Sequence, residues 1–376
     1  MQTKVARTIL EIKPECWDQV NQGDTKLKSW AFLRAVEEAS INQASSLYIQ
    51  VFSGRDCIGS SVCSFARTSM VVLAQGFLHE LTKRIRIVAP GFLTADLAVG
   101  GTLVSSCTNG LSCRESDALP TLIRETEYAA RDRGAGFVLF KDFNPDEVRR
   151  YAPTFTSLGY YQVASLPGAA IEVAGASSID CFLTRFRHKY RQLVRKDYAI
   201  AQQAGLGVWD ERTYGHRNHE FIRLYRQVLD RSPTRFGVLT PAFVAGMARY
   251  MGNTTFMKVF AVADQIVALE LIVEDGDVLR PLYLGVDYRR RPDRLYYACL
   301  YHTLLHGIEH GYSRIELGQK CYEAKARYGA NRWPVAMFVK HLQPTLNKVL
   351  ARVLSRLFPP VDVVERTVLK VSEPIR

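Results

Sequence analysis

The sequence lacks the features that mark export or membrane insertion. No apolar run approaches the roughly 20 residues that a membrane-spanning helix needs. Lys4, Arg7 and Lys13 interrupt the first stretch of the chain, which has no apolar core segment and so does not read as a secretory signal. The sequence therefore predicts a cytoplasmic protein, with peripheral attachment to the inner membrane as a second option.

Patterns for metal binding and for nucleophilic hydrolysis are also missing. The eight cysteines include no Cys-x-x-Cys pair, and the chain contains no Gly-x-Ser-x-Gly elbow. His302, His306 and His310 recur at helical spacing, and the stretch 306–310 matches a reversed zinc motif. Gly307 is a poor residue for a rigid metal-binding helix. We therefore predict free thiols and no bound metal.

The composition is that of a basic globular protein. The chain has 376 residues, of which 47% are hydrophobic and 23% charged, and this length suits two domains. The formal net charge of +12 favours anionic partners such as acyl-CoA, tRNA or an acidic membrane surface. Small residues gather at 168–178, so we predict an N-terminal unit at 1–175 and a C-terminal unit at 176–376.

Both halves of the chain show the same succession of expected elements: a hairpin, a helix ending in glycine, a strand and a helical segment. In the first half the helix 121–133 precedes the strand 136–142. In the second half the helix 295–310 precedes the strand 313–318. The sequence thus predicts an α/β (α+β) fold of two tandem units, each a mixed twisted sheet flanked by helices.

A basic turn joins the expected strand 278–286 to the helix 295–310. Its arginines are Arg289, Arg290, Arg291 and Arg294. The turn precedes a helix N-terminus, where free amide groups and the helix dipole favour an anion. It is therefore the predicted site for a phosphate-bearing donor.

Segments around this turn resemble a known family. Tyr-Leu-Gly-Val-Asp-Tyr at 283–288, Glu-Leu-Gly-Gln at 316–319 and Tyr-Glu-Ala-Lys-Ala-Arg-Tyr-Gly at 322–329 resemble the FemAB-like branch of the GNAT acyltransferase superfamily. The resemblance covers the C-terminal half and implies two GNAT-like units. The first unit lacks the basic turn and the Glu-x-Lys-x-Arg segment, so we expect only the second to be catalytic. The turn departs from the usual GNAT pyrophosphate loop because it lacks glycine.

Acyl transfer to an amine needs a base, and two carboxylates are candidates. Glu270 lies in an otherwise apolar strand, where burial would raise its pKa towards a useful range. Asp287 ends the strand beside the basic turn. The alternatives are that Glu270 faces solvent and that Asp287 only caps the turn.

The family resemblance points to further site residues between 319 and 327. Lys325 is the candidate for stabilising an oxyanion or holding a phosphate, with a surface ion pair as the alternative. Tyr322 is the candidate proton donor to the leaving thiolate, unless it only packs. Gln319, Glu323 and Arg327 are assigned to substrate binding. We expect Lys325 and the arginines of the turn to meet in one cleft.

Two further basic helices suggest contact with anionic surfaces. In the helix 185–196, Lys189 and Arg191 are assigned to an anionic substrate or lipid headgroup, with ion pairing inside the protein as the alternative. The helix 345–357 has one apolar face and carries no acid. It either docks on its own domain or lies in a membrane interface.

We therefore predict an N-acyltransferase that moves an acyl group from acyl-CoA or acyl-carrier protein to a primary amine. A long-chain amino alcohol or amino lipid, as in bacterial ceramide synthesis, is the expected acceptor class. Acyl-CoA would be a co-substrate, and we expect no permanently bound cofactor. Two alternatives stay open: aminoacyl-tRNA-dependent transfer of the FemAB type, which we rank lower, and a basic nucleic-acid or membrane-binding adaptor without catalysis. The sequence does not indicate an oligomeric state.

Overall fold

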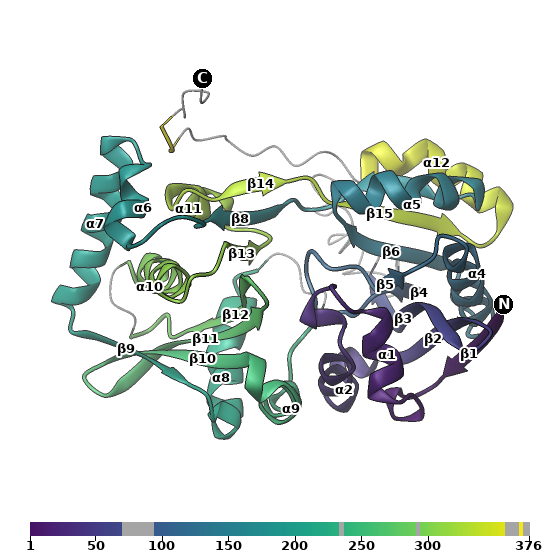
Figure 1. Cartoon of the computed structure of the whole chain (residues 1–376), viewed down its shortest axis with the longest axis horizontal. Coiled ribbons are helices and arrows are strands. Elements are labelled where there is room, and N and C mark those ends of the chain that lie inside the picture. Colours follow the sequence, from purple (N-terminus) through teal and green to yellow (C-terminus); the bar gives the residue numbers. More distant parts are fainter. Residues whose placement is uncertain (70–93, 233–236, 291–293, 358–367, 371–376) are drawn as a thin grey trace, which may run out of the picture. The chain divides into compact units, whose positions relative to one another are not determined.

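The structure is a computed structural model that describes residues 1–69, 94–232, 237–290, 294–357 and 368–370 (Figure 1). The chain forms two compact units, and each is discontinuous in sequence. Unit 1 comprises Met1–Leu166, Thr234–Gly246 and Pro334–Val361. Unit 2 comprises Pro167–Pro233, Met247–Trp333 and Asp362–Arg376.

Unit 1 is built on an eight-stranded sheet with the order β1-β2-β3-β4-β6-β15-β7, and β5 pairs with β3. Its strands are β1 (Gln2–Ala6), β2 (Ser45–Ser53), β3 (Asp56–Ser69), β4 (Thr94–Gly100), β5 (Leu111–Cys113), β6 (Phe137–Phe143), β7 (Tyr161–Ala164) and β15 (Ala336–His341). β4 and β6 are parallel, and the other pairs are antiparallel. The sheet is therefore mixed.

The helices of unit 1 are α1 (Pro14–Val20), α2 (Trp30–Glu38), α4 (Ala118–Asp132), α5 (Pro145–Ser157) and α12 (Pro344–Leu357). α9 (Pro241–Met251) begins in unit 1 and ends in unit 2. Asn144 and Glu147 form a capping box that starts α5. The core between α5 and the sheet is aromatic, and Phe155 stacks on Phe338 with ring centroids 4.2 Å apart.

Unit 2 contains a seven-stranded sheet with the order β14-β8-β13-β12-β11-β10-β9. Its strands are β8 (Gly168–Glu172), β9 (Leu206–Glu211), β10 (Thr255–Val262), β11 (Gln265–Asp275), β12 (Val278–Val286), β13 (Arg314–Gly318) and β14 (Asn331–Trp333). β12 and β13 are parallel, whereas the remaining pairs are antiparallel.

The helices assigned wholly to unit 2 are α6 (Ile179–Thr184), α7 (His188–Gln203), α8 (Asn218–Leu229), α10 (Leu295–Glu309) and α11 (Tyr322–Arg327). α10 covers one face of the sheet and α8 the other (Figure 1). Leu300, Leu304 and Ile308 of α10 are buried in the main core of this unit. No helix within the described ranges combines the length and apolarity that crossing a bilayer requires.

The predicted fold, two mixed sheets flanked by helices, is confirmed. The predicted division between residues 175 and 176 differs from the observed units for two segments, the residues 168–178 and the strand β15. The small residues at 168–178 include strand β8 as well as connecting residues, and Gly168 is required because a Cβ there would lie 2.2 Å from the Trp333 ring. β15 was predicted in the C-terminal unit, but it pairs with β6 and β7 of unit 1.

Candidate functional site

The parallel strands β12 and β13 are paired only near their starts. Their register joins Val278 to Arg314 and Leu279 to Ile315, while β12 continues to Val286 and β13 to Gly318. Because parallel strands run in the same direction, their carboxyl ends lie at the same edge of the sheet. The basic turn follows β12, and the segment 319–327 follows β13. The topology therefore places both sequence-predicted segments at one edge.

The turn after β12 is organised by Asp287. This buried carboxylate accepts a hydrogen bond from the Arg289 amide at 3.0 Å, and its other oxygen lies 3.5 Å from Arg223 of α8. Asp287 thus caps the turn, and its predicted role as a base stays a prediction. Arg289 and Arg290 are exposed, and Arg290 donates to the Gln265 side chain at 2.9 Å. Arg291 lies outside the described residues.

Asp197 of α7 brings two of the predicted arginines together. Its carboxylate is 2% exposed, accepts a hydrogen bond from Arg327 at 3.0 Å, and lies 3.6 Å from Arg294 Nε. The Arg327 guanidinium also lies over the Tyr297 ring, 4.4 Å from its centroid. The start of α10, the helix α11 and the basic helix α7 therefore meet around one buried acid.

Lys325 has different surroundings from these arginines. It is 5% exposed, and its ammonium donates to the carbonyl oxygens of Leu317 at 2.7 Å and Gln319 at 2.9 Å. Tyr322 likewise donates to a backbone carbonyl, that of Pro167, at 2.8 Å. Both side chains therefore hold backbone around α11, and their predicted chemical roles stay predictions.

The remaining predicted binding residues lie on α7 and around α11. Lys189 is exposed and Arg191 half-buried on α7. Glu323 is exposed, and Gln319 is half-buried directly after β13. Their assignment to substrate binding also stays a prediction.

Glu270 of β11 is buried against α10. Thr303 of α10 donates a hydrogen bond to Glu270 Oε2 at 2.6 Å. Burial raises the pKa of Glu270 to about 7, although the Thr303 bond and the nearby Lys258 oppose the rise. A carboxyl with this pKa can both accept and release a proton near neutral pH.

Two charged groups near Glu270 were missed from the sequence, one on the neighbouring strand β10 and one on β9 beyond it. Lys258 of β10 is buried and donates to Asp210 of β9 at 2.5 Å, and His306 Nδ1 lies 3.0 Å from the same carboxylate. Lys258 interrupts an apolar strand just as Glu270 does, so the same signal was available. Within the described ranges, no three or more His, Cys, Asp or Glu residues are grouped so that they could hold a metal ion.

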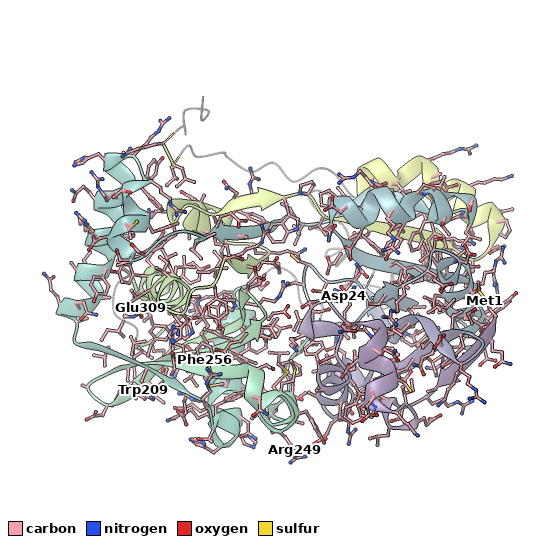
Figure 2. All side chains as sticks on the ribbon, in the orientation of Figure 1. Met1, Asp24, Trp209, Arg249, Phe256 and Glu309 are labelled. Carbon is pink, nitrogen blue, oxygen red and sulfur yellow. The ribbon has the colours of Figure 1, made fainter. Side chains whose placement is uncertain are left out.

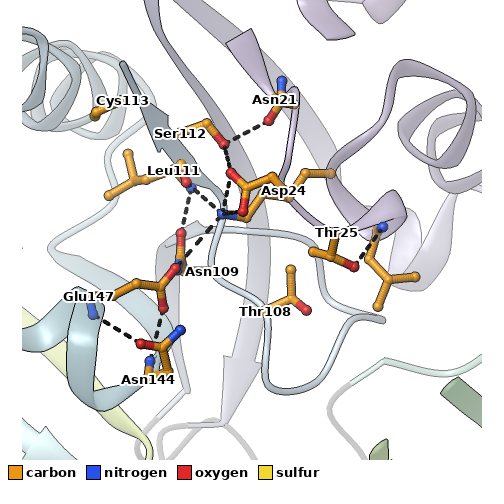
Figure 3. A network of polar contacts seen from close by, with 12 residues as sticks. Asn21, Asp24, Thr25, Thr108, Asn109, Leu111, Ser112, Cys113, Asn144 and Glu147 are labelled. Carbon is orange, nitrogen blue, oxygen red and sulfur yellow. Dashed lines mark hydrogen bonds and ion pairs between the residues drawn. The ribbon is translucent and has the colours of Figure 1, made fainter. Parts of the chain in front are cut away.

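Unit 1 contains a separate polar network, in which Figure 3 labels Asp24, Asn109 and Glu147. The buried Lys28 ammonium donates to Asp24 at 3.2 Å and to the Leu111 carbonyl at 2.8 Å, and lies 3.9 Å from Glu147. Asn109 donates to Glu147 at 2.6 Å. The charge of Lys28 is thus matched by acids of its own unit, which indicates a structural hub.

Three solved structures are similar to the chain over nearly its whole length. FemX is 12% identical with a TM-score of 0.59, covering 93% of this chain and 100% of that one. The L-PGS of Bacillus licheniformis is 13% identical with a TM-score of 0.54, covering 92% and 98%. The C-terminal domain of a putative lysylphosphatidylglycerol synthetase from Agrobacterium fabrum is 12% identical with a TM-score of 0.54, covering 93% and 98%. At this identity, these likenesses show the fold.

A curated relative is longer than this chain. The putative 8-amino-7-oxononanoate synthase 2 of Mycobacterium tuberculosis is 24% identical over 339 residues, covering 86% of this chain and 43% of that protein. The chain therefore spans less than half the length of the curated relative.

A family model matches the C-terminal half of the chain. The FemAB-like model, described as peptidoglycan biosynthesis/recognition, matches residues 169–365, which is more than half of the 376 residues. The chain belongs to the FemAB-like family, as the segments around its basic turn predicted.

Proposed function

We propose that unit 2 transfers an acyl group from a phosphate-bearing carrier, acyl-CoA or acyl-carrier protein, to a primary amine. The observation that carries this proposal is that the guanidinium groups of Arg294 and Arg327 both pair with one carboxylate, that of Asp197. One acid balances only one of the two guanidinium charges, so a positive charge remains at the start of the 15-residue helix α10. The helix dipole adds to this charge, and together they favour a phosphate group.

The reaction requires the acceptor to lose a proton. The amine nitrogen forms a bond to the acyl carbon, the carbon–sulfur bond of the thioester breaks, and the base takes one proton from the amine. In this proposal Glu270 is the base and Asp287 holds the turn. Tyr296 of α10 lies near both the buried carboxyl and the edge of the sheet, since burial and the nearby Cys321 and Glu270 raise its pKa. The leaving thiolate takes a proton from Tyr322 or from water.

The proposed acceptor is an amine on a long carbon chain, such as an amino alcohol or amino lipid. The name of the Mycobacterium relative, putative 8-amino-7-oxononanoate synthase 2, denotes a product with an amine on a carbon chain, and this chemical feature supports the acceptor class. For such an acceptor we also propose contact between α12 and an anionic membrane surface, at the cytoplasmic side. Leu346 and Val349 of α12 are exposed beside Lys348, which supports this contact.

An aminoacyl-tRNA donor is the second candidate. The basic segment at α7 favours it, because Lys189 and Lys196 are exposed on the helix and Arg187 is exposed directly before it. Phosphate contacts of this kind weaken steeply with salt. The basic turn also lacks the glycine that allows close approach of a pyrophosphate to the backbone.

A transfer assay with purified protein tests the proposal. The protein is incubated with an amino alcohol and with acyl-CoA, acyl-carrier protein or aminoacyl-tRNA, and amide formation is followed by mass spectrometry. We expect Arg294→Gln and Arg327→Gln each to raise the KM for the donor about tenfold, because each variant loses one charge-assisted contact with phosphate. Arg149→Gln, an exposed arginine of α5 in unit 1, is the control. Salt-dependent RNA binding without any transfer would favour the adaptor alternative instead.

A further inference from the structure

A row of charged side chains crosses three strands of unit 2 beneath α10. Lys258 of β10 is the register partner of Glu270 of β11 on one side and of Asp210 of β9 on the other. Residues directly opposite each other on neighbouring strands point to the same face of a sheet. Figure 2 labels Phe256 of β10 and Glu309 of α10, the strand and the helix that contribute to this region. The three side chains therefore form one layer between sheet and helix.

The layer is held by specific contacts. Lys258 donates to Asp210 Oδ1 at 2.5 Å, and His306 Nδ1 lies 3.0 Å from Asp210 Oδ2. Thr303 donates to Glu270 at 2.6 Å. Lys258 is 4% exposed and Glu270 6%. Lys258 and Glu270 are thus fixed in position and largely removed from water, and interactions between charges are strong in such surroundings. Asp210, on the edge strand β9, keeps a side chain that is 33% exposed.

Only some of the titratable groups around Glu270 and Lys258 are charged at neutral pH. From α10, burial raises the pKa values of Tyr296 and Cys299 well above their usual ranges, so both are neutral. Burial, together with Lys258, lowers the pKa of His302 to about 4, so its ring is neutral as well.

From the strands, the bonds from His306 and Lys258 outweigh burial and lower the pKa of Asp210 to about 2. Asp210 is therefore ionised, and its Lys258 partner is the buried cation beside Glu270. Of the groups that act on the pKa of Glu270, Lys258 lowers it and Asp210 raises it, in opposition to each other.

We propose that Lys258, fixed by Asp210, is a positioning residue that sets the charge state of Glu270 during transfer, an inference that rests on the proposed role of Glu270 as base. When Glu270 is ionised, the ammonium of Lys258 lies between two carboxylates. When Glu270 takes the proton of the acceptor amine, Lys258 still has Asp210 as its partner. Lys258 is therefore paired at both stages. This matters because a buried cation without a partner would be costly.

The test is the dependence of the transfer rate on pH. Lys258→Met removes the cation beside Glu270, so the acid limb of the profile should move up by about one pH unit, the expected size for one nearby charge. Asp210→Asn leaves Lys258 without its competing acid, so the limb should move down. Lys340→Met removes a paired lysine from unit 1, where Lys340 bonds Glu127 at 2.6 Å, and should leave the limb in place. A residue that only supports the fold would lower the rate without shifting the limb in opposite directions.

A second measurement separates this inference from the proposed function. Carbon-13 NMR of labelled glutamate follows the titration of Glu270 without substrate, and Glu270→Gln identifies its signal. Equal titration of Glu270 in all variants overturns the inference, whatever the activity. If the Glu270 titration moves in opposite directions in Lys258→Met and Asp210→Asn while the pH profile of the rate does not move, Glu270 is not the base. The catalytic part of the inference is then overturned as well. The double variant Lys258→Met with Asp210→Asn removes both charges together, so no buried charge is left without its partner and the fold is preserved. In this variant Glu270 should titrate between its positions in the two single variants.

Discussion

Asp197 Oδ2 accepts a hydrogen bond from Arg327 Nη1 at 3.0 Å, although the two residues lie far apart in the chain. The same carboxylate lies 3.6 Å from Arg294. Through this single acid, α7 fixes both α11 and the start of α10. The acid therefore holds together the positive charge on which the proposed donor site depends.

We expect Asp197→Asn to lower the free energy of unfolding by about 2–4 kcal/mol, because a buried ion pair loses one partner. An amide cannot balance either guanidinium charge, so Arg294 and Arg327 would repel each other. Urea denaturation measures the change. Asp180→Asn is the control, since the ion pair of Asp180 with Arg195 is exposed and should contribute less than about 1 kcal/mol. Equal stability of the two variants would show that the contacts of Asp197 add little.

Glu270→Gln should make the protein more stable at high pH than the natural chain. The folded pKa of Glu270 is about 7, against 4.5 as its ordinary value, so the folded state binds the proton more tightly than the unfolded state. Stability from this group is present at low pH and is lost as the pH rises through this window. Relative to the natural chain, the variant should gain on the order of 2 kcal/mol between about pH 5 and about pH 8. Thermal unfolding at both pH values measures this gain.

Glu274 of the same strand provides a control of opposite sign. The hydrogen bond from Arg212 lowers the pKa of Glu274, so its stabilising effect is present at neutral pH and is lost as the medium becomes acidic. Glu274→Gln should therefore reduce stability at about pH 8 more than at low pH. The same trend in both glutamine variants would contradict the assignment of Glu270 as a buried acid.

Lys325→Met should destabilise unit 2 by about 1–3 kcal/mol, because two carbonyl oxygens lose their common donor. Methionine keeps the apolar stem, so the loss reports the ammonium group. Lys189→Met is the control, since Lys189 is exposed on α7 and should change stability by less than about 0.5 kcal/mol. Chemical denaturation distinguishes the two. If Lys325→Met leaves the free energy of unfolding unchanged, the structural role of Lys325 is contradicted and its predicted chemical role is favoured.

The sequence was sufficient to locate the basic turn and the helix 295–310, because apolar periodicity is a local property. It left open whether Glu270 faces the core or solvent. It was not sufficient to pair Asp197 with Arg294 and Arg327, since charge pairing depends on how distant segments meet. Lys258 could have been found from its own strand, where it interrupts an apolar run in the same way as Glu270. Its partnership with Asp210 additionally needed the order of the strands.

The unit boundaries show the same limit. An apolar run identifies β15 as a strand, but nothing local selects β6 and β7 as its neighbours. The small residues of β8 suggested a linker because the reason for them, the ring of Trp333, lies far along the chain. Strand partners and close contacts of this kind are properties of the assembled sheet.

Gly285→Ala should destabilise unit 2, because α8 approaches β12 closely at this position. A Cβ on Gly285 would lie 2.8 Å from both the Leu224 Cβ and the Tyr225 amide nitrogen, so backbone must shift, at a cost of about 1–3 kcal/mol. On β9, a Cβ on Gly207 would meet only the Ala261 carbonyl oxygen at 3.8 Å. Gly207→Ala should therefore be neutral or slightly stabilising. Similar melting temperatures for the two variants would disprove the close approach.

The two faces of α12 should respond differently to truncation. Leu350 is 8% exposed, whereas Val349 is 51% exposed. Leu350→Ala should lower stability by about 2–3 kcal/mol, and Val349→Ala by less than about 0.5 kcal/mol. Urea denaturation that shows equal effects would contradict the docking of this helix on its own unit.

The exposed side of α12 is the part that the proposed membrane contact uses. Leu346→Ser combined with Val349→Ser should reduce binding to vesicles of anionic phospholipid several-fold, because apolar side chains no longer enter the interface. Stability should stay unchanged, since both side chains are already in water. Lys348→Gln should weaken the same binding less, and only at low salt, because a single surface charge is screened within about 10 Å at moderate salt. If the double serine variant sediments with vesicles as the natural chain does, α12 does not bind lipid, and its exposed leucine and valine are only the solvent-facing remainder of a docked helix.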